Sequence, residues 1–275
     1  MSGNGKRHRH ETYPIYAATP GVNWSTLRAM GQSPAHYHYR LTHPVVATPA
    51  MNLGRLLHTA VLEPDALPLE YAVFDGARRA GEVWEQFAAA NAGKTIVKAE
   101  EYNLALDVRD AVRRHKAARR LLRFGRAEVT LRWVDERTHV RCKARLDWLC
   151  GDVFVDLKST RDAEPRAFGR TFERLAYHGQ FAFYRRGLIA CGHRPADVYA
   201  IAVESEAPHD VMVYQVDEDV LAAGDLLVHD YLHRVRQCRS NRRWPGRDQG
   251  VQSLEFPAWA LPSTGAYADM IEVLT

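Results

Sequence analysis

The chain has 275 residues, of which 46% are hydrophobic and 25% are charged, and its formal net charge is +4. This composition is typical of a globular protein and excludes collagen-like, coiled-coil and wholly disordered chains. The length suits one large domain or two small ones, and either can bury a core. Because no run of about 18 apolar residues occurs, we expect no membrane span.

The N-terminus and the cysteines indicate a cytoplasmic protein. The first ten residues are rich in Lys, Arg and His but lack an apolar stretch, so they do not form a secretory signal. We expect residues 1–21 to be a flexible basic arm. The four cysteines are scattered and form no C-x-x-C pair, which argues against a zinc ribbon. In a reducing cytoplasm we expect their thiols to be free.

The hydrophobic period divides the chain into a helical front and a catalytic core. A period of 3.6 predicts helices in the front, residues 22–125, and the period then changes to 2. The expected helices of the front span 22–40, 51–63, 81–92 and 99–124, with a loop at 41–50. The expected elements of the core, residues 126–240, are strands at 127–134, 139–150, 152–158, 197–204 and 211–216, and helices at 172–191 and 218–238.

This order of elements predicts a mixed α/β (α+β) fold in which helices flank a central sheet. The prolines after residue 240, at positions 245, 257 and 262, predict that residues 241–275 form an irregular tail.

Two basic clusters stand out along the chain. Residues 113–126 contain seven Lys or Arg and no acid. A later group comprises Arg234, Arg236, Arg239, Arg242, Arg243 and Arg247. Such clusters suit a phosphate backbone, because each neutralised phosphate releases condensed counterions. A single basic run is more often a solvated helix face, but two runs and a basic arm together favour a polyanionic partner.

A central hairpin carries the most informative pattern. Gly151-Asp152 is a natural two-residue turn, and glycine in first place suits type II′. In that register Asp147 lies directly opposite Asp156, with Cβ atoms roughly 4.5–5.5 Å apart. Lys158 follows two residues after Asp156 on the same face, about 6.6 Å along the strand.

The other face of this hairpin is expected to be its core face. It carries the apolar residues Leu146, Trp148, Val153, Val155 and Leu157. Two carboxylates held together on the polar face would repel each other, so their placement favours a divalent cation between them. Mg²⁺ prefers oxygen ligands, and the Leu157 carbonyl could add one. Lys158 would then lie beside the attacking water.

The neighbouring strands extend the polar face. Glu128, Thr130 and Arg132 alternate with apolar residues on one strand, and Arg141, Lys143 and Arg145 do so on the next. We therefore expect an acidic metal pocket within a basic track, as a metal-dependent phosphodiesterase needs. The alternative is a solvated half-sheet held by cross-strand ion pairs.

Two helices supply further candidates. His58 follows Gly54 by one turn on the same helix face, where glycine would permit close approach of another element. Gln180 and Tyr184 stand at positions i and i+4, so they project from one face and could hydrogen-bond a carboxylate or phosphate. Taken alone, the histidine could equally be a packed or exposed residue, and Tyr184 a core residue beside a solvated Gln180.

Together these residues resemble the PD-(D/E)XK nuclease superfamily, and more narrowly the exonuclease VIII (RecE-type) C-terminal nuclease domain near the RecB-like branch. The resemblance spans roughly residues 22–240. Its motifs are Gly54-x-x-x-His58, Glu128, Arg145-Leu146-Asp147-Trp148, Val155-Asp156-Leu157-Lys158-Ser159-Thr160 and Gln180-x-x-x-Tyr184. The superfamily's usual proline before the first aspartate is replaced by Leu146, which removes no ligand.

The resemblance implies a role for each matched residue. Asp147 and Asp156 would ligate Mg²⁺, with Mn²⁺ as the alternative ion, and Lys158 would be the catalytic lysine. His58 and Glu128 would complete or hold the metal site, and Gln180 and Tyr184 would support it. No iron–sulfur cluster is expected, because Cys142, Cys150, Cys191 and Cys238 lack the spacing that relatives of this branch use.

The resemblance also implies a biological setting. The expected activity is exonucleolytic digestion of linear double-stranded DNA from 5′ ends, by a ring-like homotetramer. The expected partner is a single-strand annealing protein of the RecT type in a prophage recombination system. The alternatives are a RecB-like or CRISPR-associated nuclease acting on single strands in repair, and a catalytically silent DNA-binding protein of the same fold. A small-molecule enzyme lacks support, because no Gly-rich phosphate loop and no G-x-S-x-G motif occurs.

Overall fold

The computed structural model describes residues 5–8, 11–43, 45–194, 197–247 and 250–255. The chain divides into two units, Met1–Pro245 and Gly246–Thr275. The described residues after position 241 contain no helix or strand, and the rest of the expected tail, from residue 256, lies outside the described residues. All elements named below belong to the first unit.

A six-stranded mixed sheet forms the centre of this unit, in the order β1-β4-β5-β6-β7-β8. The strands are β1 (Gly5–His8), β4 (Arg126–Val134), β5 (Arg141–Cys150), β6 (Val153–Thr160), β7 (Val198–Glu204) and β8 (Val211–Gln215). Neighbouring strands are antiparallel except β6 and β7, which are parallel. A parallel pair needs a crossover, and two helices between β6 and β7 provide it. The mixed α/β fold with a sheet flanked by helices is confirmed.

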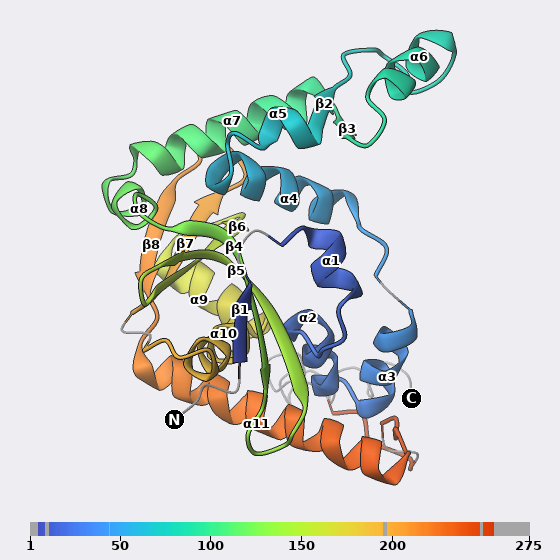
Figure 1. The fold of residues 1–275 in the computed structure, drawn as a ribbon, viewed down its shortest axis with the longest axis vertical. Coiled ribbons are helices and arrows are strands. Elements are labelled where there is room, and N and C mark those ends of the chain that lie inside the picture. The colour runs from blue at the N-terminus through green and yellow to red at the C-terminus, as the bar shows by residue number, and fades with distance from the viewer. Residues whose placement is uncertain (1–4, 9–10, 44, 195–196, 248–249, 256–275) are drawn as a thin grey trace, which may run out of the picture. The chain divides into compact units, whose positions relative to one another are not determined.

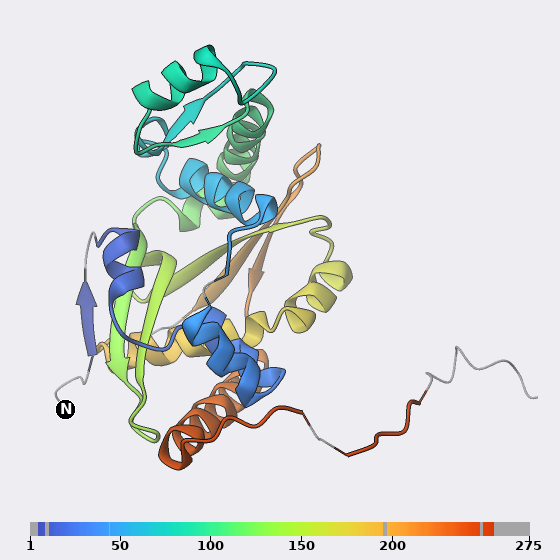
Figure 2. The ribbon, with the colours of Figure 1, turned by 90° about the vertical axis from the view of Figure 1, so that its right-hand side faces the viewer.

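Helices cover both faces of the sheet (Figures 1 and 2). One layer contains α2 (Trp24–Leu27), α9 (Pro165–Arg174), α10 (Tyr177–Ala190) and α11 (Glu218–Asn241), packed around a large core cluster. The opposite layer contains α4 (Pro49–Leu62) and α7 (Ala99–Arg114), which enclose a second cluster against β6 and β7. Helices α10 and α11 approach closely at Gly224, where an added Cβ would lie 2.1 Å from the His178 carbonyl oxygen.

Several expected helices are divided in the structure. The predicted helix 172–191 is two helices, because Ala176 adopts a left-handed conformation between α9 and α10. The predicted helix 99–124 ends at Arg114, where His115 is extended and its ring accepts a hydrogen bond from the Ala118 amide to cap α8 (Lys116–Leu121). The predicted helix 22–40 comprises α2, a 3₁₀ turn at Arg28–Gly31 and α3 (Pro34–Thr42).

The helical front also contains a small parallel sheet that sequence patterns did not reveal. It pairs β2 (Tyr71–Val73) with β3 (Thr95–Val97). Helix α5 (Leu67–Glu70) precedes it, and α6 (Glu82–Ala90) connects its strands. With three residues each, these strands are too short to show an alternation.

The N-terminal segment differs from the expected flexible arm. Strand β1 pairs with β4, and α1 (Tyr13–Ala18) follows it. The Lys143 ammonium donates to the backbone carbonyls of Tyr16, Ala17 and Thr19 at 2.8, 3.0 and 2.7 Å. Positive charge is favourable at a helix C-terminus, so this lysine holds the end of α1 on the sheet. Residues 1–4 and 9–10 of the expected arm lie outside the described residues.

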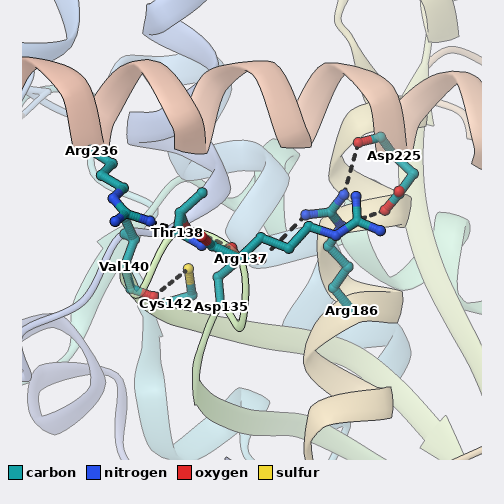
Figure 3. A network of polar contacts seen from close by, with 8 residues as sticks. All are labelled: Asp135, Arg137, Thr138, Val140, Cys142, Arg186, Asp225 and Arg236. Atoms are coloured by element: carbon teal, nitrogen blue, oxygen red, sulfur yellow. Dashed lines mark hydrogen bonds and ion pairs between the residues drawn. The ribbon is translucent and has the colours of Figure 1, made fainter.

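A polar network ties the β4–β5 loop to the helices behind it (Figure 3). Arg186 of α10 contacts Asp135 in this loop at 3.3 Å and pairs with Asp225 of α11. Thr138 donates to Asp135 through its amide at 2.9 Å and its hydroxyl at 2.6 Å. This network fixes the loop end of the β4–β5 hairpin, whose second strand carries Asp147.

Two further features of the structure concern membrane spans and the cysteines. No helix among the described residues has both the length and the apolar character that a membrane crossing requires. No disulfide joins cysteines of the described residues, and two of them, Cys142 and Cys238, are buried.

Candidate functional site

The hairpin of β5 and β6 has the predicted register. Cys150 pairs with Val153, and Trp148 pairs with Val155. Gly151 has a φ of +59°, a left-handed conformation that glycine adopts at no steric cost and that explains its place in the turn.

The β5–β6 pairing ends just before the two aspartates would face each other. The Leu157 amide instead donates to Asp147 Oδ2 at 2.8 Å. The aspartate side chain therefore takes the place of a ladder carbonyl, and the two strands separate at the point where Asp147 and Asp156 lie.

The predicted core face of this hairpin is wrong in part. Leu146 packs in the cluster beneath α10, whereas Trp148, Val155 and Leu157 pack in the opposite cluster beneath α4. The alternation of β5 thus reverses at Asp147. The alternation of β4 likewise reverses at Glu128, whose φ of +55° is in the left-handed region. Both acids therefore lie at an irregularity of the sheet.

Asp156 lies at the centre of the polar group. Its side chain is fully buried, and its Oδ2 forms an ion pair with the Lys158 ammonium. Gln180 connects the two residues from α10, because its Oε1 accepts from Lys158 at 3.1 Å and its amide donates to Asp156 Oδ1 at 3.4 Å. The same amide donates to the Tyr184 hydroxyl at 3.1 Å, so the structure brings both predicted α10 residues to the aspartate and lysine.

His58 reaches the site from α4 on the other side of the strands. Its Nδ1 is 3.5 Å from Asp147 Oδ2, and its ring hydrogen-bonds the Leu157 backbone carbonyl. Burial lowers the pKa of His58, so its neutral form is favoured at neutral pH. The expected close approach at Gly54 is wrong, because an added Cβ there would meet nothing within 4 Å. The helix surface before His58 is open.

Glu128 of β4 forms an ion pair with Arg145 of β5, whose register partner is Thr130. Burial and the charge of Asp147 raise the pKa of Glu128 to about 7. Burial and the charge of Asp156 also raise the pKa of Asp147. Burial alone would lower the pKa of Lys158, but the neighbouring Asp156 carboxylate and two further acidic groups raise it. Three carboxylates thus face two cations, and the site holds excess negative charge.

The expected basic track along the sheet is wrong. Lys143 is buried and donates to the carbonyls at the end of α1. Arg132 pairs with Glu11 at 2.5 Å, and Arg145 pairs with Glu128. The N-terminal segment covers part of this face, so Arg132, Lys143 and Arg145 are engaged within the protein, whereas Arg141 stays exposed. The alternative of a solvated half-sheet is right in part, because the ion pair of Arg145 with Glu128 joins two strands, but the N-terminal segment rather than solvent lies over this part of the face.

The donor chemistry fits a hard divalent cation. In the part of the chain that the structure describes, no three His, Cys, Asp or Glu side chains form a metal-binding group as they stand. Lys158 and Arg145 contact two of the carboxylates. Burial, and after it the neighbouring carboxylates, raise the pKa of Asp147 and of Glu128, and a bound cation would favour their charged forms. Oxygen ligands of this kind suit Mg²⁺. The ligand set His58, Glu128, Asp147, Asp156 and Leu157 stays a prediction.

Two residues of this site were not predicted. The Lys158 ammonium lies 4.3 Å from the centroid of the Tyr177 ring, which supports it by a cation–π contact. Tyr177 precedes Gln180 by three residues, so helical spacing could have placed it on the same face. Tyr13 of α1 lies 5.7 Å from the guanidinium carbons of both Arg55 and Arg145, and no sequence signal placed this helix there.

Comparisons with known proteins agree with this geometry. Residues 23–255 match a family described as "PDDEXK-like domain of unknown function (DUF3799)". A solved structure titled "Putative exonuclease" from Eubacterium rectale is 12% identical and covers 91% of this chain and 96% of that chain, with a TM-score of 0.60. This likeness shows a common fold. The resemblance to the PD-(D/E)XK superfamily is confirmed, and the narrower one to exonuclease VIII stays a prediction.

Two further results of the comparisons carry no argument. The solved structure of SSO0001 is 13% identical and covers 80% of each chain, but its TM-score of 0.39 is too low for an inference. No curated protein matches the chain.

Proposed function

The chain belongs to the PDDEXK-like family DUF3799, and from that premise we propose that it is a Mg²⁺-dependent exodeoxyribonuclease that degrades linear double-stranded DNA. One observation carries the proposal. Asp147, Asp156 and Lys158 converge where β5 and β6 separate, and the excess negative charge there calls for a cation. Family membership by itself supports a nuclease.

The residues of the chain divide the work of hydrolysis. Asp147, Asp156 and the Leu157 carbonyl would hold Mg²⁺, which when bound polarises a phosphate and makes water a better nucleophile. Lys158 carries a positive charge at the reacting phosphate and stabilises the negative charge that develops there. Gln180 holds Lys158 beside Asp156, and Tyr177 lies against the ammonium.

His58 and Glu128 act as positioning residues in this proposal. His58 is favoured in its neutral form, donates to the Leu157 carbonyl and lies beside Asp147, so it orients the strand edge that holds the ion. Glu128 places its carboxylate near Asp147, and Arg145 limits the repulsion between them. Removing either residue would weaken ion binding more than it would change the bond-breaking step.

The proposed preference for DNA ends rests on a structural neighbour and on the sequence motifs. The Eubacterium rectale neighbour is named as an exonuclease, and the sequence motifs resemble those of exonuclease VIII. From these we propose 5′-to-3′ digestion that exposes 3′ single strands for annealing. A homotetramer and a RecT-type annealing partner belong to the same proposal and rest on the sequence resemblance alone.

Release of acid-soluble nucleotides from equal masses of linear and closed-circular duplex DNA tests this proposal. We expect release from linear DNA in Mg²⁺, none in EDTA, and none from closed circles. Cutting of closed circles would make the protein an endonuclease. Release from single-stranded DNA alone would favour the RecB-like alternative, and no release from any DNA would favour a silent DNA-binding protein.

A further inference from the structure

We propose that a basic surface on α8 and the turn after it binds single-stranded DNA next to the candidate site. This surface, the α8 patch, consists of Lys116, Arg119, Arg120, Arg123, Phe124 and Arg126. The proposal deepens the proposed function and rests on it, because it names the surface that holds the strand adjoining the cleaved phosphate.

The cations of the α8 patch are left available for a partner. All five are exposed, and none forms an ion pair in the part of the chain that the structure describes. Two arginines of the later cluster, by contrast, are engaged within the protein. Arg234 contacts Asp230 at 3.5 Å, and Arg236 donates to the Arg137 carbonyl at 3.0 Å. Five unpaired cations within eleven residues complement a phosphate backbone, since binding would release condensed counterions.

Phe124 indicates a single strand rather than a duplex. Its side chain is 69% exposed, and the Arg123 guanidinium carbon lies 4.7 Å from its ring centroid. An isolated exposed phenylalanine is unremarkable, but an aromatic ring among unpaired cations forms a platform on which bases stack. A duplex keeps its base faces covered by neighbouring pairs, so only unpaired bases can use this ring.

The α8 patch is fixed close to the catalytic strands. Gly125 packs so tightly on Trp148 that an added Cβ would lie 2.2 Å from the indole Nε1. Trp148 follows Asp147 directly, and Arg126 pairs with Leu149 on the same strand. Arg126 precedes Glu128 by two residues, about 6.6 Å along β4. A DNA strand that leaves the candidate site in this direction therefore meets the α8 patch first.

Fluorescence anisotropy of labelled DNA in EDTA tests the proposal without cleavage. The probes are a 20-nucleotide oligothymidine and a 20-base-pair duplex. The patch variant is Arg119→Glu/Arg120→Glu. The matched control is Arg40→Glu/Arg78→Glu, which changes the net charge equally at two exposed arginines on α3 and between β2 and α6, away from α8 in Figure 1.

We expect the patch variant to bind oligothymidine at least tenfold more weakly than the wild type. Its salt dependence should fall by about 1.4 in the slope of log K against log salt, as two lost phosphate contacts on a single strand require. The control should stay within twofold. Phe124→Ala should weaken oligothymidine binding about tenfold and leave duplex binding unchanged. Equal losses in patch and control variants would overturn the proposal, as would an equal effect of Phe124→Ala on both probes.

The same variants separate this proposal from the proposed function. In a nuclease assay the patch variant should keep kcat and raise KM. A wild-type protein that binds through the patch but never cleaves DNA would refute the nuclease and support the patch. A wild-type nuclease whose patch and control variants bind alike would refute the patch alone.

Discussion

Arg186 should contribute far more to stability than its neighbour Arg185. Arg186 is 16% exposed and lies between Asp135, which is 7% exposed, and Asp225. Among the residues that the structure describes, Arg185 forms an ion pair with Glu218 alone, whose side chain is 72% exposed. The two arginines are adjacent on α10, so Arg185→Met is a matched control for Arg186→Met.

The burial of the partner carboxylates sets the expected difference in unfolding free energy between the two variants. Breaking a buried ion pair by removing one partner costs about 3–5 kcal/mol, because the other charge stays buried and unpaired. Asp135 keeps its hydrogen bonds from Thr138, so we expect Arg186→Met to lower the free energy of unfolding by about 3 kcal/mol, the lower end of that range. An exposed pair contributes about 0–1 kcal/mol, which is the loss we expect for Arg185→Met.

Equilibrium unfolding in urea, followed by circular dichroism, measures both changes. The denaturant slope should stay constant, so that the shift in midpoint reports stability. Losses that agree within about 0.5 kcal/mol for the two variants would refute the view that burial of Asp135 gives Arg186 its importance.

Three further predictions concern stability. Lys143→Met should release α1 and lower the free energy of unfolding by about 2 kcal/mol. The control Arg141→Met, at an exposed position on the same strand, should change the free energy of unfolding little. Limited proteolysis measures the release of α1, and urea unfolding measures the change in stability. Because the pKa of Glu128 is raised from 4.5 to about 7, the folded state binds this proton more tightly than the unfolded state. The Glu128 carboxyl should therefore lower stability by up to about 3 kcal/mol as pH rises from 4.5 to 7. In a pH series of unfolding curves Glu128→Gln should make the fall smaller and leave the part that Asp147 contributes through its own raised pKa. Gly224→Ala should cost at least about 2 kcal/mol through overpacking against α10, whereas Gly169→Ala, with open space around it on α9, should be neutral or stabilising in thermal melts.

Local chemistry made parts of the site predictable. The Gly151-Asp152 turn fixed the hairpin register, because a two-residue loop with glycine first has few alternatives. Helical spacing placed Gln180 and Tyr184 on one face, and the structure joins them to Asp156. The positions of β4 to β8 were also predictable, since each of these five strands is long enough to show alternation or a continuous apolar run.

Other features depend on contacts that sequence patterns do not encode. Lys143 alternates with apolar residues as a solvent-facing lysine would, yet its partners lie more than 120 residues earlier in the chain. The reversal of the strands at Glu128 requires a left-handed conformation in a residue that rarely adopts it, so no local signal announces it. Ala176 divides α9 from α10 for the same reason.

The most direct measurement of the central claim compares Mg²⁺-dependent nucleotide release from linear duplex DNA by the wild type and two variants. Asp156→Asn removes one charge at the centre of the site, and Asp152→Asn makes the same change at the half-exposed hairpin turn. If both proteins stay folded, as near-ultraviolet circular dichroism would report, we expect Asp156→Asn to lose at least 99% of the activity and Asp152→Asn to keep most of it, a difference of about 3 kcal/mol in activation free energy. Equal activity in the two variants would contradict the assignment of this aspartate, and with it the proposed site.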